Sequence, residues 1–368
     1  WNSLEKPSGS NDLYCMIFAP DSRYLVISGD RATQVWDVQA NRETKILSAG
    51  RPSFSEDGKF IILERYTSNY SVYQTADWNR VISLNESYPL ISPDGKKVAS
   101  LWENQISERR YDISGLVLHD LQSGRTLVRL PKLQNATFSQ DGSFMAASQK
   151  GEIAIVDAVN GKELFRLSGE YTPTFLTNNQ YLVTAGSNGK SNLWSLPEGK
   201  LIQSFIGSCP GIMADGKTLF TLTPGQAHLY NLPEGGGAAQ GEEIPVRSLS
   251  FPTPVANVTF HPDGKTLIEY SSLGVRWINM ADNTVRAEFP PGSVFNPDYS
   301  LYAIPIGTHV EIRSTATNEL QQSVESGSAG QIRFSPNGDW LAVSNPISTI
   351  TLFTLKDGKK VAQMAIAS

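Results

Sequence analysis

Short apolar runs alternate with polar turns along the whole chain. Near the N-terminal end these runs cover residues 13–18, 24–28, 34–38 and 45–47, and each is bounded by polar or turn-forming residues. Runs of this length, without a sustained helical period of about 3.6 residues, favour strands over helices. The pattern predicts an all-β chain built from groups of four short strands.

One short phrase recurs in the sequence: an aromatic or aliphatic anchor residue is followed three positions later by Asp or Asn, and often then by Gly. Its nine anchors are Phe18, Phe54, Ile91, Phe138, Phe175, Ile212, Phe260, Phe295 and Phe334. Successive anchors are 35 to 39 residues apart, except for two intervals of 47 and 48 residues that contain insertions. An Asp-Gly pair suits a tight turn, because Asp bonds to its own backbone and Gly accepts a positive φ. We therefore expect these aspartates to be structural rather than catalytic.

The size of the repeating unit predicts how the units assemble. A four-stranded meander of about 40 residues cannot bury both of its faces, whereas units stacked around an axis cover one another. Nine units therefore predict a single closed β-propeller of four-stranded antiparallel blades, with residues 1–368 as one domain. The alternative is a propeller of eight blades, in which one weak unit is a distorted addition.

Two of the units carry the most specific local sequence. Phe18-Ala-Pro-Asp21 is followed by Val35-Trp36-Asp37-Val38, and Gly186-Ser-Asn-Gly189 precedes Leu193-Trp194-Ser195-Leu196. On these residues the chain resembles the WD-repeat propellers, and the resemblance extends over essentially its whole length. It implies a non-catalytic scaffold for protein–protein interaction, or a docking subunit of a multiprotein assembly.

Two features depart from the pattern of that family. The Gly-His pair that precedes many family repeats is missing, so we expect a divergent, bacterial branch of the family. We do not expect the hydrogen-bonded tetrad that this His forms in other members. The family usually closes its ring by letting an N-terminal strand complete the last blade. Here the units run in phase from first strand to fourth, with residues 360–364 as the expected last strand. The first and last blades then meet by packing, or residues 1–10 supply an extra element.

Charge and composition narrow the partners. The net charge of −5 and the pI near 5.5 provide no basic field for phosphates, so we expect no nucleic-acid partner. No apolar run reaches the roughly 20 residues that span a bilayer, so we expect no transmembrane segment. Cys15 and Cys209 lie far apart in apolar surroundings and are interpreted as buried free thiols. The first residue is Trp1 rather than Met, which favours an exported or envelope protein.

The sequence lacks the patterns of an enzyme. Its four histidines, His119, His228, His261 and His309, are solitary and do not have the spacing of metal ligands. It contains no Gly-x-Ser-x-Gly nucleophile motif. We therefore predict no catalytic, metal-binding or cofactor-binding residue. The alternatives are a small-molecule or metal-dependent enzyme that uses the propeller channel, and a sensor or recruitment module of a longer polypeptide.

The two insertions supply the candidate binding residues. Residues 103–114 fall between the second and third strands of the third unit, and loops on a rigid scaffold are where binding residues concentrate. The candidate contacts with other protein subunits are Tyr66, Tyr70, Glu108, Arg109, Arg110, Tyr111 and Asp112. The alternative interpretation of this insertion is a solvated hairpin extension. Residues 234–243, with three consecutive glycines, predict a flexible loop between the third and fourth strands of the sixth unit.

Overall fold

The computed structural model describes the chain except for residues 1–12, 66–68, 108–109, 150, 170–172, 177–178, 187, 214–215, 233–241, 244, 251–256, 346–348 and 366–368. Within the described residues all regular secondary structure is β-strand, and no helix is present. None of these residues belongs to a helix that is long and apolar enough to cross a membrane. The chain divides into two compact units, residues 1–83 with 292–368 and residues 84–291.

The first unit contains four sheets of four strands each. Blade 1 consists of β1 (Leu13–Phe18), β2 (Tyr24–Gly29), β3 (Ala32–Asp37) and β4 (Arg42–Ser48). Blade 2 consists of β5 (Arg51–Phe54), β6 (Phe60–Arg65), β7 (Asn69–Gln74) and β8 (Arg80–Leu84). Blade 8 consists of β30 (Val294–Phe295), β31 (Leu301–Ile306), β32 (His309–Ser314) and β33 (Leu320–Glu325). Blade 9 consists of β34 (Ile332–Phe334), β35 (Trp340–Ser344), β36 (Thr349–Thr354) and β37 (Lys360–Ala365).

The second unit contains the other five sheets. Blade 3 consists of β9 (Ser87–Ile91), β10 (Lys97–Ser107), β11 (Arg110–Asp120) and β12 (Thr126–Pro131), and blade 4 of β13 (Asn135–Phe138), β14 (Phe144–Gln149), β15 (Glu152–Asp157) and β16 (Lys162–Ser168). Blade 5 consists of β17 (Thr174–Phe175), β18 (Tyr181–Ala185), β19 (Lys190–Ser195) and β20 (Leu201–Ile206), with β24 (Glu242–Glu243) added at its outer edge. Blade 6 consists of β21 (Ser208–Ile212), β22 (Thr218–Thr223), β23 (Gln226–Asn231) and β25 (Arg247–Ser250), and blade 7 of β26 (Asn257–Phe260), β27 (Thr266–Ser271), β28 (Gly274–Asn279) and β29 (Val285–Phe289).

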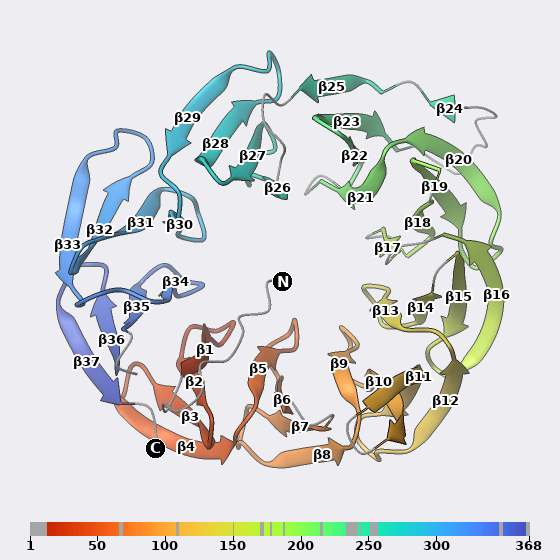
Figure 1. Ribbon diagram of the computed structural model, residues 1–368, viewed down its shortest axis with the longest axis horizontal. Coiled ribbons are helices and arrows are strands. Elements are labelled where there is room, and N and C mark those ends of the chain that lie inside the picture. The colour runs from red at the N-terminus through yellow and green to blue at the C-terminus, as the bar shows by residue number, and fades with distance from the viewer. Residues whose placement is uncertain are drawn as a thin grey trace. The chain divides into compact units, whose positions relative to one another are not determined.

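Nine antiparallel blades are therefore present in the described part of the chain, and the fold is that of a nine-bladed β-propeller. This confirms the number of repeats that the anchors predict, and the alternative of eight blades is wrong. Within each blade the four main strands lie side by side in chain order, as Figure 1 shows for β1 to β4.

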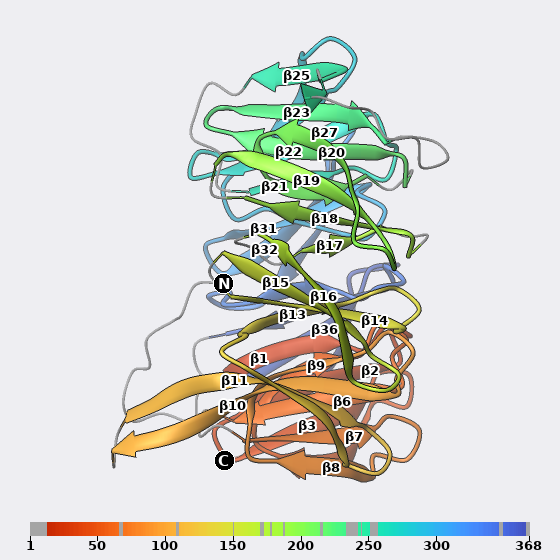
Figure 2. The same ribbon diagram turned by 90° about the vertical axis from the view of Figure 1, so that its right-hand side faces the viewer.

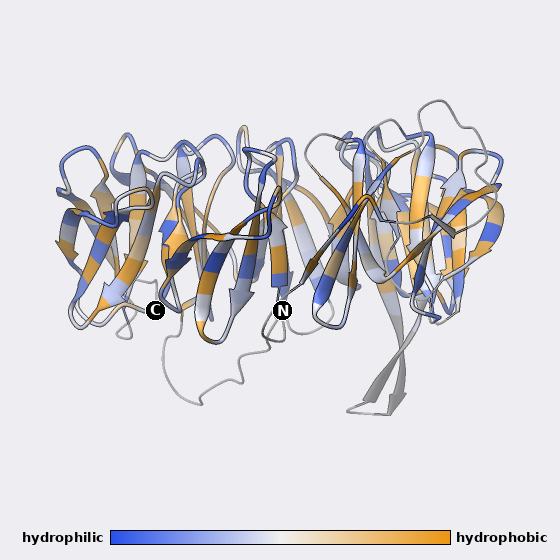
Figure 3. Ribbon diagram, turned by 90° about the horizontal axis from the view of Figure 1, so that it is seen from above, coloured by the Kyte–Doolittle hydropathy of each residue, from blue (hydrophilic) through white to orange (hydrophobic). Residues whose placement is uncertain are grey.

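Hydrophobic side chains gather between neighbouring blades. In the first unit Val26 of blade 1 packs in one cluster with Ile61 of blade 2. In the second unit Leu118 of blade 3 packs with Met145 of blade 4. Figure 3 shows hydrophobic positions along the strands and hydrophilic positions at the turns. Within each unit, neighbouring blades thus bury their faces against one another, which is how small sheets can share a core.

The first and last blades meet within the first unit. Blade 9 is complete with its own four strands, and β37 confirms the expected last strand. Met16 of β1 belongs to the hydrophobic cluster that joins the two blades. The Ser22 hydroxyl accepts a hydrogen bond from the Asn337 backbone at 2.9 Å, and the Asn41 amide donates to the Val361 carbonyl at 3.2 Å. These blades therefore meet by packing, which is one of the two predicted alternatives. The other alternative gives residues 1–10 an extra structural element, and these residues lie outside the described ones.

One position in the turn after each anchor has a positive φ in all nine blades. The residue that follows the Asp or Asn position has a φ between 55° and 76°. These residues are Gly58, Gly95, Gly142, Gly216, Gly264, Gly338, Ser22, Asn179 and Tyr299. A left-handed residue at this place ends the first strand and starts the second, which is why the phrase marks every blade.

Candidate functional site

The insertion at residues 103–114 lengthens two strands of blade 3. Strands β10 and β11 have 11 residues each, whereas the longest of the other strands have seven. Figure 2 shows the two strands projecting together beyond the other strands of their blade. The insertion therefore extends the hairpin formed by β10 and β11, and we call residues 103–107 and 110–114 the arm.

The arm is a two-stranded ribbon. Strand β9 pairs with β10 only as far as Leu101, and β12 pairs with β11 only as far as Gly115. Beyond these positions, within the described residues, β10 and β11 pair with each other alone, from Glu103 opposite Ile113 to Ser107 opposite Arg110. Among the described strands, none extends the sheet along either outer edge of the arm at residues 103–107 and 110–113.

Close packing holds the base of the arm. Trp102 and Gly115 face each other across the ladder, and the register shifts immediately beyond Trp102. A Cβ atom on Gly115 would lie 2.6 Å from the Trp102 ring and 2.4 Å from the Leu130 carbonyl oxygen. The Arg129 guanidinium carbon lies 5.3 Å from the Trp102 ring centroid, within the range of a cation–π contact. The base of the arm is thus packed by the Trp102 and Arg129 side chains against the backbone at Gly115 and Leu130.

The seven candidate contact residues fall into three groups. Arg110, Tyr111 and Asp112 form the start of β11, and their backbones pair with Ser107, Gln105 and Asn104. Glu108, Arg109 and Tyr66 lie outside the described residues. Tyr70 lies on β7 with 1% of its surface exposed, so its side chain belongs to the packing of blade 2 and not to an exposed patch.

Most of the second insertion, residues 234–241, lies outside the described residues. At its end, where the sequence predicts loop, Glu242 and Glu243 form the short strand β24, which pairs with a strand of another blade. The pairing is parallel, with Glu242 opposite Ser204 and Glu243 opposite Phe205 of β20. Between β23 and β25 of blade 6, the chain therefore reaches across to the outer edge of blade 5.

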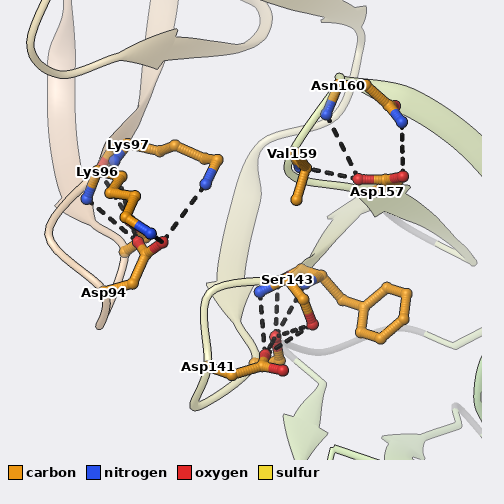
Figure 4. Close-up of polar contacts among 11 residues, drawn as sticks. Asp94, Lys96, Lys97, Asp141, Ser143, Asp157, Val159 and Asn160 are labelled. Atoms are coloured by element: carbon orange, nitrogen blue, oxygen red, sulfur yellow. Dashed lines mark hydrogen bonds and ion pairs between the residues drawn. The ribbon is translucent and has the colours of Figure 1, made fainter.

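The anchor carboxylates accept hydrogen bonds from residues of their own turns, as Figure 4 shows for blades 3 and 4. Asp141 accepts hydrogen bonds from the Ser143 backbone at 3.0 Å and from the Ser139 hydroxyl at 2.7 Å. Burial raises the pKa of the Asp141 carboxyl, but these hydrogen bonds outweigh burial, and the pKa lies below its ordinary value of 3.8. In blade 3, Asp94 accepts a bond from the Lys96 backbone at 3.1 Å, and its carboxylate lies 3.6 Å from the Lys97 ammonium. Both carboxylates thus hold the turns in which they lie.

Blade 3 also contains a buried polar cluster that the sequence did not predict. The His119 Nε2 atom lies 3.0 Å from the Glu86 carboxylate, to which the Ser100 hydroxyl also donates. All three side chains are buried, and Thr126 lies 3.3 Å from the other ring nitrogen of His119. His119 occupies the place that Trp has in the best-matched units, while Glu86 precedes β9, outside the recurring phrase. The cluster links β10, β11 and the start of the blade from which the arm projects.

The other histidines are held by local contacts. Both ring nitrogens of His228 face hydroxyls, Thr223 at 2.9 Å and Ser248 at 2.8 Å, and burial lowers the pKa of this His. His261 lies 3.4 Å from the Asp263 carboxylate, within its own turn. Among the described residues, no group of three or more His, Cys, Asp or Glu side chains is placed to hold a metal ion.

Comparisons with known proteins agree with this architecture. Residues 2–37 match the WD domain, G-beta repeat family. The chain is similar to a crystal structure of the eukaryotic initiation factor, with a TM-score of 0.64 and 14% identity over 91% of this chain and 94% of that chain. It is also similar to the C-terminal WD40 domain of Sif2, with a TM-score of 0.53 and 14% identity over 80% of this chain and 92% of that one. No curated protein sequence matches the chain. At such low identity, the similarity to solved structures establishes the propeller fold alone.

Proposed function

We propose a function from the premise that this chain is a WD40-type β-propeller. It acts as a single propeller domain that binds other protein subunits and catalyses no reaction. WD40 propellers are generally scaffolds for protein interaction. The observation that carries the proposal for this chain is the arm on blade 3, which is longer than any other hairpin among the described residues.

Two properties of the arm support a role in binding. Its own base is packed around Trp102 and Gly115, and binding residues are most effective on such a rigid support. Its tip also carries the residue types that dominate interface energies, with Arg110 and Tyr111 next to each other on β11. We propose that residues 108–112 contact a partner subunit, with Tyr66 as a further contact. Tyr70 is left out of this surface because it is buried.

The test compares the arm with another exposed strand. The wild-type protein, a variant with Arg110→Ala and Tyr111→Ala, and a control with Arg42→Ala and Ile46→Ala on β4 are each recovered with mild crosslinking. Co-purifying chains and crosslinked residues are then identified by mass spectrometry. Because a few Arg and Tyr residues usually dominate an interface, we expect the arm variant to bind a recurrent partner at least about tenfold more weakly, while the control binds normally.

Two results would contradict the proposal. Recovery of the wild-type chain without any recurrent partner would argue against a docking subunit. Equal recovery of the partner by the arm variant and the β4 control would show that another surface makes the contact.

A further inference from the structure

The outer edge of blade 5 differs from the outer edges of the other blades. Among the nine fourth strands of the blades, β20, with the sequence Leu-Ile-Gln-Ser-Phe-Ile, is the only one without a charged residue. Charged side chains on an edge strand discourage other chains from pairing with its backbone. Blade 5 therefore lacks the protection that the other blades have.

This same edge already carries an added strand. Strand β24 pairs in parallel with Ser204 and Phe205, which shows that an extended segment fits there and in which direction it runs. Within the described residues, β24 covers only these two positions of the six-residue strand. At the two ends of β20, Leu201 and Ile206 are 46% and 41% exposed. A longer segment in the same direction has room to pair with more of β20 than β24 does.

The surroundings of β20 favour an acidic segment. The two residues of β24 are both glutamates. Lys200 immediately precedes β20, and Lys190 of β19 lies opposite Ile206 in the ladder, so a cation stands at each end of the uncharged strand. An extended peptide that carries carboxylates would therefore combine backbone pairing with charge complementarity.

We propose that the outer edge of β20 is a docking site for an extended acidic segment of a partner protein, and that β24 closes this site from within the chain. The partner segment would pair in parallel with β20 and displace Glu242 and Glu243. Strand addition of this kind takes its affinity from backbone hydrogen bonds, and a partner that pairs over six residues would outcompete a two-residue strand. The site lies on a different blade from the arm and goes beyond the function proposed above.

The experiment uses the full chain and a synthetic peptide with the sequence of residues 238–246 as the probe. A variant with Glu242→Pro and Glu243→Pro removes two backbone donors from β24 and so empties the edge. Since the internal strand competes with the peptide in the wild type, we expect the variant to bind the peptide at least about tenfold more tightly. Hydrogen exchange gives a second readout, because whichever of the Ser204 and Phe205 amides faces β24 should exchange faster in the variant and slow again when the peptide binds.

Matched controls separate edge docking from unspecific adhesion. Adding Ile206→Glu to the proline variant places a negative charge on the edge and should abolish binding of the acidic peptide. Adding Leu164→Glu instead, at an exposed position of the outer strand β16, should leave binding unchanged. A peptide in which both glutamates are replaced by lysine should bind more weakly than the original.

The proposal is overturned if the proline variant does not bind the peptide, or if Ile206→Glu and Leu164→Glu have the same effect. If the proline variant does not fold, Glu242→Gly with Glu243→Gly weakens β24 without removing backbone donors, and the same comparison applies. All of these variants leave the arm intact, so a negative result here does not bear on binding through the arm.

Discussion

The left-handed residue of each anchor turn is glycine in six blades and Ser22, Asn179 or Tyr299 in the other three. For an L-residue with a side chain this conformation is unfavourable, so it persists only where other contacts stabilise it. Ser22 reaches the backbone of Asn337 in blade 9, and the Asn179 side chain accepts a hydrogen bond from the Gln140 backbone of blade 4 at 3.0 Å. At these two turns a hydrogen bond to the neighbouring blade thus offsets the cost of the left-handed conformation, which glycine adopts without that cost.

Two glycines at equivalent turns of the second unit allow backbone strain to be separated from crowding. Both have a positive φ, but a Cβ on Gly142 would lie 2.8 Å from the Asp94 carboxyl carbon, whereas a Cβ on Gly264 meets no atom within 4 Å. We expect Gly264→Ala to lower the free energy of unfolding by about 1 kcal/mol, the cost of the left-handed conformation. Gly142→Ala should cost about 1 to 3 kcal/mol more, since overpacking adds to strain. Denaturant unfolding of both variants measures the difference, and equal losses would refute the role of the Asp94 contact.

At the scale of the elements, the sequence predicted the turns, because their conformation depends on the residues within them. The anchor turns define the start of each blade, because Asp, Asn and Gly at those places suit the turn in any tertiary context, and all nine blades follow from them. The two insertions were harder to interpret, since their conformation depends on distant partners. Residues 103–107 extend a hairpin on a base formed by Trp102 and Gly115, and Glu242 and Glu243 form a strand only because the edge of β20 accepts them.

The candidate site could be predicted only in part for the same reason. The position of the insertion in blade 3 located the arm, but its residues do not say how far the two strands continue to pair. The burial of Tyr70 could not be recognised, because its fully buried position depends on the neighbours of β7. Glu86, which bonds to His119, lies outside the recurring phrase and carries no signal of its own.

The base of the arm provides a prediction at this scale. Gly115→Ala would bring a methyl group against the Trp102 ring and the Leu130 carbonyl. The pairing between the two strands of the arm should therefore be weakened. We expect the backbone amides of residues 103–107 and 110–113 to exchange about tenfold faster, as local opening becomes less costly. Gly151→Ala is the control, because Gly151 lies between β14 and β15 of blade 4, has a φ of +83° and meets no atom within 4 Å. Unchanged exchange in the arm of the Gly115→Ala variant would show that this packing does not hold it.

At the scale of the whole molecule, the core is divided among the interfaces between blades. In the first unit, separate clusters join blade 8 to blade 9, blade 9 to blade 1, and blade 1 to blade 2. In the second unit, four more clusters join blades 3 through 7 in order. Stability in such a repeat architecture is approximately the sum of the blades and their nearest-neighbour interfaces.

The repeated turns also give the whole molecule a common response to acid. The pKa lies below the ordinary value of 3.8 for the anchor carboxyls of Asp57, Asp94, Asp141, Asp263 and Asp298. A carboxyl whose pKa is lower in the folded than in the unfolded chain stabilises the fold above the unfolded value, and this contribution is lost as the pH falls through the folded value. We therefore expect the denaturant midpoint to be nearly constant between about pH 5 and 7 with respect to these groups, and to fall steeply below about pH 4.

The variant Asp141→Asn tests this origin. Asparagine keeps an oxygen that can accept the backbone bond from Ser143 but does not titrate, so the variant should lose less stability between about pH 5 and pH 3 than the wild type. Denaturant midpoints at both pH values give this comparison. An identical loss in the two proteins would mean that the anchor carboxylates do not cause the acid sensitivity.

The junction between blades 9 and 1 has a consequence for how such a chain can change. Since blade 9 has four strands of its own, side-chain packing and a few polar bonds join the two blades, and no sheet among the described strands contains strands of both. A circular permutation that opens the chain at another boundary between blades of this unit would therefore cut no sheet. Likewise, duplication or deletion of a stretch of DNA that encodes one repeat would add or remove a whole blade, so the number of blades can drift in evolution without any strand having to find a new partner.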